Sequence, residues 1–154
     1  MAERVNSISV SKTDRFYAWA MVVLAVLGAA DSFYLLIYKL TGNNRMCLGN
    51  GGCHNVNFSP YAEIYGIPIS AIGLAAYLVM AAMVLLEPRI RLLRDNNPLL
   101  LFGMTLIGVA FSLYLTYLEL YVIHAVCPFC VTSAIVISLM FILAIIRLVK
   151  QTAS

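Results

Sequence analysis

Four cysteines in two closely spaced pairs are the residues of this chain best suited to chemistry. Cys47 and Cys53 lie in a segment rich in glycine and asparagine, and Cys127 and Cys130 form a C-P-F-C motif. Paired thiols can be oxidised to a disulfide and can exchange it with another pair through a mixed disulfide. The cysteines therefore predict a protein that carries electrons between thiols.

The C-P-F-C motif opens the last apolar segment of the chain, and its spacing and position both favour redox chemistry. Residues three apart share one face of a helix, so Cys127 and Cys130 are placed to form a disulfide across its first turn. Helix N termini stabilise thiolates, which attack a disulfide or a quinone. At about 1.5 Å per residue, Cys130 should lie about 4.5 Å deeper in the membrane than Cys127. We therefore expect Cys127 to exchange with the loop cysteines and Cys130 to face a hydrophobic electron acceptor.

The composition indicates a membrane protein. Of the 154 residues, 62% are hydrophobic and 11% are charged, which is far from the balance of a soluble domain. A spanning helix needs about 20 apolar residues, and four stretches reach that length: 17–38, 67–86, 98–123 and 126–149. The predicted fold is an all-α bundle of four transmembrane helices, a single domain over 1–154 with an outer redox loop at 40–66. The first stretch is too long for a signal-peptide core and is expected to remain as an anchor.

The basic residues predict the orientation of the four helices. Lys39 and Arg45 fall on one side, and the other eight of the ten Lys and Arg residues fall on the opposite side. The positive-inside rule makes the second side cytoplasmic. Both termini and the 87–97 loop are therefore expected in the cytoplasm, and all four cysteines are expected on the outer side of the cell membrane. The basic loops are expected to contact anionic lipid rather than nucleic acid.

Prolines, a serine and a glycine predict where several helices begin and end. In the outer loop, Ser59 can cap a short surface helix that has Pro60 at its first position and Gly66 at its end. Pro98 and Pro128 are expected just inside the third and fourth spans, where a missing amide hydrogen costs little.

Two acidic residues lie inside apolar segments. Asp31 and Glu119 are costly at these positions and are expected to face the interior of the bundle. Ser112, Thr116 and Glu119 share a helix face, so a polar stripe should run toward the cysteines. Two interpretations stay open for these groups, namely interhelical hydrogen bonding and proton delivery.

Other candidate residues surround the predicted redox elements. His54 and His124 flank the cysteines and are suited to act as acid, base or thiolate partner, although a surface histidine next to a cysteine is often incidental. Most of the tyrosines lie toward the outer side, where an aromatic belt at the membrane surface accounts for most of them. Among these outer tyrosines, Tyr117 is a candidate to contact the ring of a bound ligand. The outer tyrosines are Tyr34, Tyr38, Tyr61, Tyr65, Tyr114, Tyr117 and Tyr121.

Taken together, these pieces resemble the vitamin K epoxide reductase family over nearly the whole chain. The matching pieces are Cys47 with Cys53, C-H-N-V-N-F-S at 53–59, Y-G-I-P-I-S at 65–70 and C-P-F-C at 127–130. The resemblance implies a four-helix bundle around a quinone. It also implies loop cysteines that accept electrons from a thioredoxin-fold partner, and a C-x-x-C pair that passes them to the quinone. Because the family places the matching serine near the active site, Ser59 joins Cys130 and Tyr117 as a residue expected at the quinone.

Within this family the chain looks like a prokaryotic member. Such a protein oxidises a separate thioredoxin-fold partner, which in turn forms disulfides in exported proteins, and its expected acceptor is menaquinone or ubiquinone. The vertebrate enzymes carry a tyrosine four residues beyond the second C-x-x-C cysteine, where this chain has Ala134. That departure puts epoxide reduction and a vertebrate-like inhibitor response in doubt, and reduction of vitamin K quinone or epoxide is kept as an alternative function.

Two other classes of protein would use the same cysteines without redox turnover. Four cysteines in C-x5-C and C-x2-C patterns are able to coordinate zinc, and two disulfides can be purely structural. An outward, disulfide-permissive compartment and a thiol inside the membrane favour redox chemistry over both. No resident metal is therefore expected.

Overall fold

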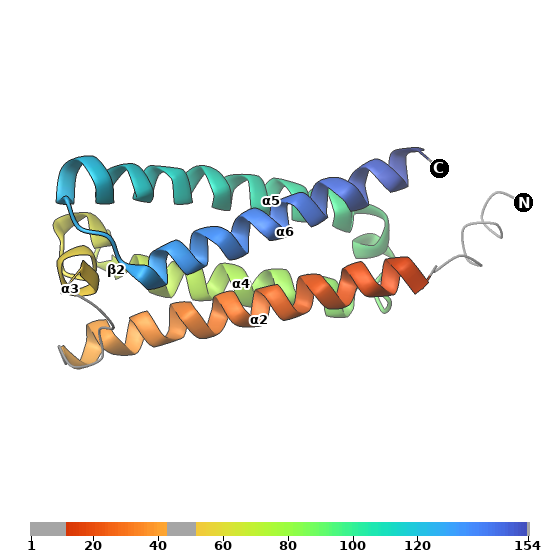
Figure 1. Ribbon diagram of the computed structural model, residues 1–154. Coiled ribbons are helices and arrows are strands. Elements are labelled where there is room, and N and C mark those ends of the chain that lie inside the picture. Colours follow the sequence, from red (N-terminus) through yellow and green to blue (C-terminus); the bar gives the residue numbers. More distant parts are fainter. Residues whose placement is uncertain (1–11, 43–51, 154) are drawn as a thin grey trace, which may run out of the picture.

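The computed structural model describes residues 12–42 and 52–153, and these residues form a bundle of four long helices (Figure 1). Each helix contains a stretch that is long and apolar enough to cross a membrane. This confirms the predicted all-α bundle of four transmembrane helices, and the chain is a multi-pass membrane protein. The four helices are α2 (Lys12–Thr41), α4 (Ile69–Leu86), α5 (Arg91–Tyr117) and α6 (Pro128–Ala153).

The helices pack around a small core and expose apolar side chains over most of their surface. Helix α2 contacts α4 and α6, and α5 packs mainly against α6. Met21, Met80 and Met140 are fully buried in the centre, whereas Trp19 and Ile107 are 64% and 71% exposed. Such exposure suits lipid rather than water as the surrounding medium, because a soluble domain rarely shows large continuous apolar surfaces.

The two ends of the bundle differ in what they carry. Figure 1 shows the start of α2 and the end of α6 at one end, while the short helix α3 (Gly52–Asn57) and the start of α6 lie at the other. The C-P-F-C motif and the helix that carries Cys53 are therefore at the same end, called here the cysteine end.

The third helix begins earlier than the sequence predicted. It starts at Arg91, and Pro98 lies inside it rather than in its first turn. The reason is that 91–97 is polar, so a search for apolar stretches cannot find this part of the helix. The buried Asn97 side chain donates a hydrogen bond of 2.9 Å to Glu87 Oε2, which ties the early turns of α5 to the end of α4.

The outer loop also differs from the prediction. The expected helix from Ser59 to Gly66 is reduced to a single 3-10 turn, η2 (Pro60–Ala62), and an antiparallel hairpin of β1 (Glu63–Ile64) and β2 (Ile67–Pro68) follows it. Tyr65 and Gly66 form the hairpin turn, with φ of 52° and 80°. A positive φ at both central residues is typical of a type I′ hairpin turn, so Gly66 shapes a turn between strands and does not end a helix.

Candidate active site at the cysteine end

Cys127 and Cys130 lie at the start of α6. Pro128 is the first residue of the helix, as predicted, and the Cys127 carbonyl oxygen accepts a hydrogen bond of 3.1 Å from the Val131 amide. Cys127 thus occupies the N-cap position and Cys130 lies in the first turn. The Cys127 side chain is fully buried and Cys130 is half-buried. Their thiols lie within hydrogen-bonding range of each other, so the fold brings the two sulfurs together.

An apolar cluster surrounds these two thiols. Leu35 and Tyr38 from the end of α2 pack with Cys127, and Val56 of α3, Phe129 and Cys130 pack against this buried group. An aromatic contact also joins α2 to the motif, because the centroids of the Tyr34 and Phe129 rings lie 4.8 Å apart. The thiols are therefore covered by α2 and by the short helix of the outer loop.

The loop cysteines are only partly described. Cys53 is the second residue of α3, and α3 contacts both α6 and η3 (Leu118–Ile123), the segment that precedes the motif. Only the backbone of Cys53 and His54 is described, and Cys47 lies outside the described residues. Because Val56 of α3 packs against the cluster around the thiols, the backbone of α3 brings Cys53 to the same end as Cys127.

Glu119 is brought against the Cys130 thiol and the Cys127 backbone by an unusual turn. It lies in η3 (Leu118–Ile123), a π-helical segment that continues α5, and it is 4% exposed. Its carboxyl group lies within hydrogen-bonding range of the Cys130 thiol and of the Cys127 backbone. Of the predicted polar stripe, only Glu119 is buried. Thr116 is exposed and its hydroxyl donates to the Ser112 carbonyl of the same helix at 2.9 Å.

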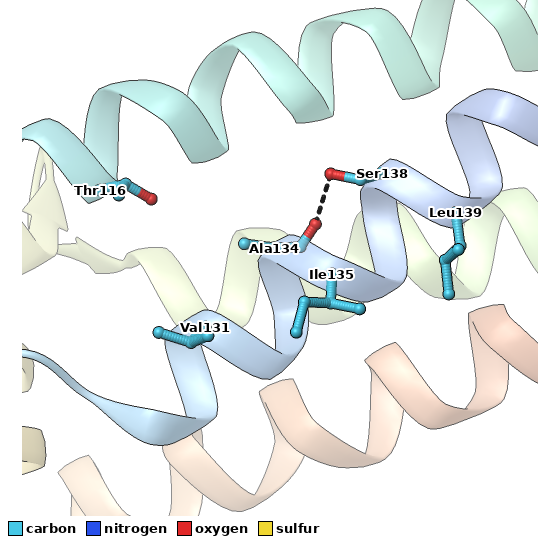
Figure 2. A pocket seen from close by; sticks show the side chains of 6 residues that line it. All are labelled: Thr116, Val131, Ala134, Ile135, Ser138 and Leu139. Carbon is cyan, nitrogen blue, oxygen red and sulfur yellow. Dashed lines mark hydrogen bonds between the residues drawn. The ribbon is translucent and has the colours of Figure 1, made fainter.

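An apolar groove of about 340 Å³ begins one residue beyond Cys130. Its walls come from the neighbouring helices α5 and α6, as Figure 2 shows. The Ser138 hydroxyl donates to the Ala134 carbonyl at 2.7 Å, so this polar group is satisfied within α6. A mainly apolar groove with a few polar groups is typical of a site for a small hydrophobic molecule. The lining residues are Thr116, Val131, Ala134, Ile135, Ser138 and Leu139.

A comparison with known proteins agrees with this arrangement. The model of the family described as "Vitamin K epoxide reductase family" matches residues 19–145, which include all four cysteines. The chain belongs to the vitamin K epoxide reductase family. The Arabidopsis thaliana protein named "Thiol-disulfide oxidoreductase LTO1" is 31% identical over 121 residues, or 75% of this chain and 32% of that protein. The chain thus spans about a third of the length of this curated relative.

Two further residues were predicted at the quinone of this vitamin K epoxide reductase family member. Ser59 is half-buried beyond the end of α3, and its hydroxyl donates to the Val56 carbonyl at 2.8 Å. Tyr117 ends α5 and is 57% exposed, with its ring 5.1 Å from that of Tyr121. The Ser59 bond holds the loop beside the thiol cluster, whereas the exposure of Tyr117 fits the aromatic belt. A direct role for either residue at the quinone stays a prediction.

The remaining candidates lie around the same end of this family member. His124 is exposed and adopts a left-handed backbone conformation with φ of 54° where the chain turns toward Cys127. Within the described ranges, no group of three His, Cys, Asp or Glu side chains is placed to hold a metal ion. The zinc alternative also involves Cys47, which lies outside those ranges.

A polar cluster deeper in the bundle was only partly foreseen. Asp31 is half-buried, with its Oδ2 atom inside the protein, as the prediction of an interior position requires. The neighbouring Tyr77 of α4 was missed, and its hydroxyl lies 3.0 Å from Ser133 Oγ of α6. The sequence signal that could have indicated this contact is Gly28, because a glycine inside an apolar helix often marks a close approach between helices. In the structure, a Cβ at Gly28 would collide with the Tyr77 ring.

Proposed function

We propose that this chain is a membrane thiol:quinone oxidoreductase. It takes electrons from a separate thioredoxin-fold protein that oxidises exported proteins, and it passes them through its two cysteine pairs to a quinone. The observation that carries the proposal is the position of the Cys127 and Cys130 thiols, which lie between the helix that carries Cys53 and an apolar groove between α5 and α6. The family to which the chain belongs and the name of its Arabidopsis relative both support thiol chemistry.

The proposed relay consists of thiol–disulfide exchanges. A thiolate of the partner attacks the Cys47–Cys53 disulfide, and the partner leaves with its own disulfide once both loop thiols are reduced. A loop thiolate then attacks Cys127 of the Cys127–Cys130 disulfide, which forms a mixed disulfide and releases Cys130 as a thiol. The second loop thiol attacks this mixed disulfide, so that the Cys47–Cys53 disulfide reforms and Cys127 is released as a thiol. Two electrons and two protons are then held by the Cys127 and Cys130 pair, and the loop disulfide is restored. The contact of α3 with the start of α6 supports this order.

The groove fits the acceptor by size and polarity. Its volume of about 340 Å³ and its mainly apolar lining suit a flat quinone ring with an isoprenoid tail. Bound there, menaquinone or ubiquinone would accept two electrons and two protons. Val131 and Ala134 would hold the ring in the groove next to Cys130, and the same apolar walls would exclude water from the reacting thiol.

The proposed membrane is the cell membrane, with the cysteine end facing outward. Arg89, Arg91 and Arg94 are exposed where α4 gives way to α5, and Figure 1 shows this junction at the end of the bundle that holds the start of α2 and the end of α6. The excess of basic residues makes that end cytoplasmic under the positive-inside rule. Oxidation of exported proteins requires this orientation.

The first test is quinol formation by the purified protein in detergent. We expect steady turnover from a reduced thioredoxin-fold partner and excess quinone, and its loss in Cys130→Ala because the thiol next to the groove is gone. Thr132→Ala is the matched control, since Thr132 is exposed on the same helix and its hydroxyl donates only to the Pro128 carbonyl of its own helix in the described contacts. Turnover that persists in Cys130→Ala would contradict the proposed relay.

A further inference from the structure

Glu119 is the buried acidic residue among the described side chains, and the relay above gives it no role. Its 4% exposure is far below that of Glu63, whose side chain is 48% exposed at the same end of the molecule. An ionisable group buried in a membrane bundle is costly, so it is usually retained for a functional reason. The position of Glu119 against both C-x-x-C residues indicates what that reason is.

The backbone around Glu119 holds its carboxyl group in place. The Glu119 carbonyl oxygen accepts a hydrogen bond from the His124 amide, which closes the π turn, and a second one of 3.0 Å from the Ala125 amide. The Cys127 backbone lies in hydrogen-bonding range of the carboxyl group, and an amide at the N terminus of a helix is a favourable donor to an anion. The carboxylate is thus oriented toward α6, with the Cys130 thiol as its second contact.

Few other ionisable groups lie near this pair. The charge interactions of the Cys130 thiol are with Cys127 and Glu119. On the packed elements, Tyr38 of α2 belongs to the apolar cluster around the thiols. His124, which follows η3, is exposed, and only the backbone of His54 in α3 is described. Glu119 is the described carboxylate in contact with the thiol nearest the groove.

We propose that Glu119 is the general base and acid at Cys130, and this role rests on the proposed function. In the balanced step, the Glu119 carboxylate takes the proton of the Cys130 thiol, and two electrons pass to the quinone as the Cys127–Cys130 disulfide forms. The protonated Glu119 then gives this proton to a quinol oxygen and returns to the carboxylate. The second quinol proton is the one that leaves the Cys127 thiol. Two thiols and a quinone thereby become a disulfide and a quinol, with no other reactant.

The test is a single turnover of the fully reduced protein with saturating quinone, followed by quinol absorbance at several pH values. General acid–base catalysis typically contributes a factor of about a hundred or more, so we expect Glu119→Gln to slow quinol formation about a hundredfold near neutral pH. The deficit should shrink as the pH rises, because hydroxide replaces the missing base. Glu119→Asp keeps a carboxyl group and should recover part of the rate.

Asp95→Asn is the matched control, because it removes a carboxylate that is exposed in α5 at the opposite end of the bundle. Its rate and pH profile should equal those of the wild type. A Glu119→Gln protein with the wild-type rate would overturn the proposal. A deficit that is the same at every pH would overturn it as well, because it would show that Glu119 only holds Cys130 in position.

A measurement without quinone separates this inference from the proposed function. Alkylation of Cys130 by N-ethylmaleimide is followed by mass spectrometry in the reduced protein as a function of pH. Charged neighbours in contact shift such a profile by about one unit or more, so Glu119→Gln should shift it and Asp95→Asn should not. If the wild type forms no quinol, the proposed function fails. An unshifted alkylation profile overturns the role of Glu119 in either case.

Discussion

Cys127 and Cys130 differ in their surroundings although only two residues separate them. Cys127 is fully buried beside Leu35 and Tyr38 of α2. Cys130 is half-buried, contacts Glu119 and is followed by Val131, the first residue that lines the groove on α6. At the residue scale, the chemistry of each sulfur depends on these neighbours more than on the motif that the two cysteines share.

Ala134 provides a test of the groove at this scale. Its small side chain lies one helical turn beyond Cys130 and helps to form the groove wall. We predict that Ala134→Leu raises the KM for quinone about tenfold, equivalent to about 1.4 kcal/mol, because the added side chain fills space needed by the ring. The same substitution at Ala82, which is exposed on α4, should leave the KM unchanged. Initial rates at varied quinone concentration measure both, and an unchanged KM in Ala134→Leu would place the quinone elsewhere.

At the scale of elements, close approaches between helices determine how the site is supported. Helix α2 packs against α4, and Gly28 allows the Tyr77 ring to lie against its backbone. The Tyr77 hydroxyl then reaches α6, where it donates to the Ser133 carbonyl at 3.2 Å and lies close to Ser133 Oγ. One side chain therefore links three helices just beyond the turn that carries Cys130.

Gly28→Ala tests this packing. A Cβ at Gly28 would overlap the Tyr77 ring, so the ring must move and its bond to Ser133 is strained. We predict a loss of about 1 to 3 kcal/mol in the free energy of unfolding, measured by denaturant titration in detergent. Gly103→Ala is the control, because a Cβ there meets no heavy atom within 4 Å and alanine favours a helix over glycine by about 1 kcal/mol. Equal stabilities for the two variants would argue against close packing at Gly28.

At the scale of the whole molecule, each end of the bundle has an ion pair between elements, and the two pairs differ in how far they are buried. At the end opposite the cysteines, Arg147 of α6 donates to both Glu87 oxygens at 2.9 and 3.0 Å, and Asn97 of α5 donates to the same carboxylate. At the cysteine end, Lys39 pairs with Glu63 of the hairpin at 3.0 Å. The first group is largely buried, whereas Glu63 is about half exposed.

This difference predicts unequal effects on stability. Glu87→Gln removes the negative charge that faces the Arg147 side chain, which is 11% exposed. Removing one partner of a buried pair leaves an uncompensated charge, and we predict a loss of about 3 kcal/mol in the free energy of unfolding. Glu63→Gln should cost less than about 1 kcal/mol, because exposed ion pairs contribute little. Denaturant titrations of both variants measure the difference, and similar losses would show that the Glu87 contact is exposed to water.

The sequence by itself determined the family, the four membrane helices and the position of two cysteines at the start of α6. Each of these depends on local signals, such as apolar length, a C-x-x-C motif and a proline at a first helical turn. The tertiary structure alone decided that Glu119 contacts Cys130, that Ala134 and Ser138 line a groove, and that residues 63–68 of the outer loop form a hairpin. Helical spacing assumes regular turns, so it cannot predict the π turn that carries Glu119. The groove arises between α5 and α6, and although these helices follow one another in the chain, its shape depends on how closely they pack after the turn between them.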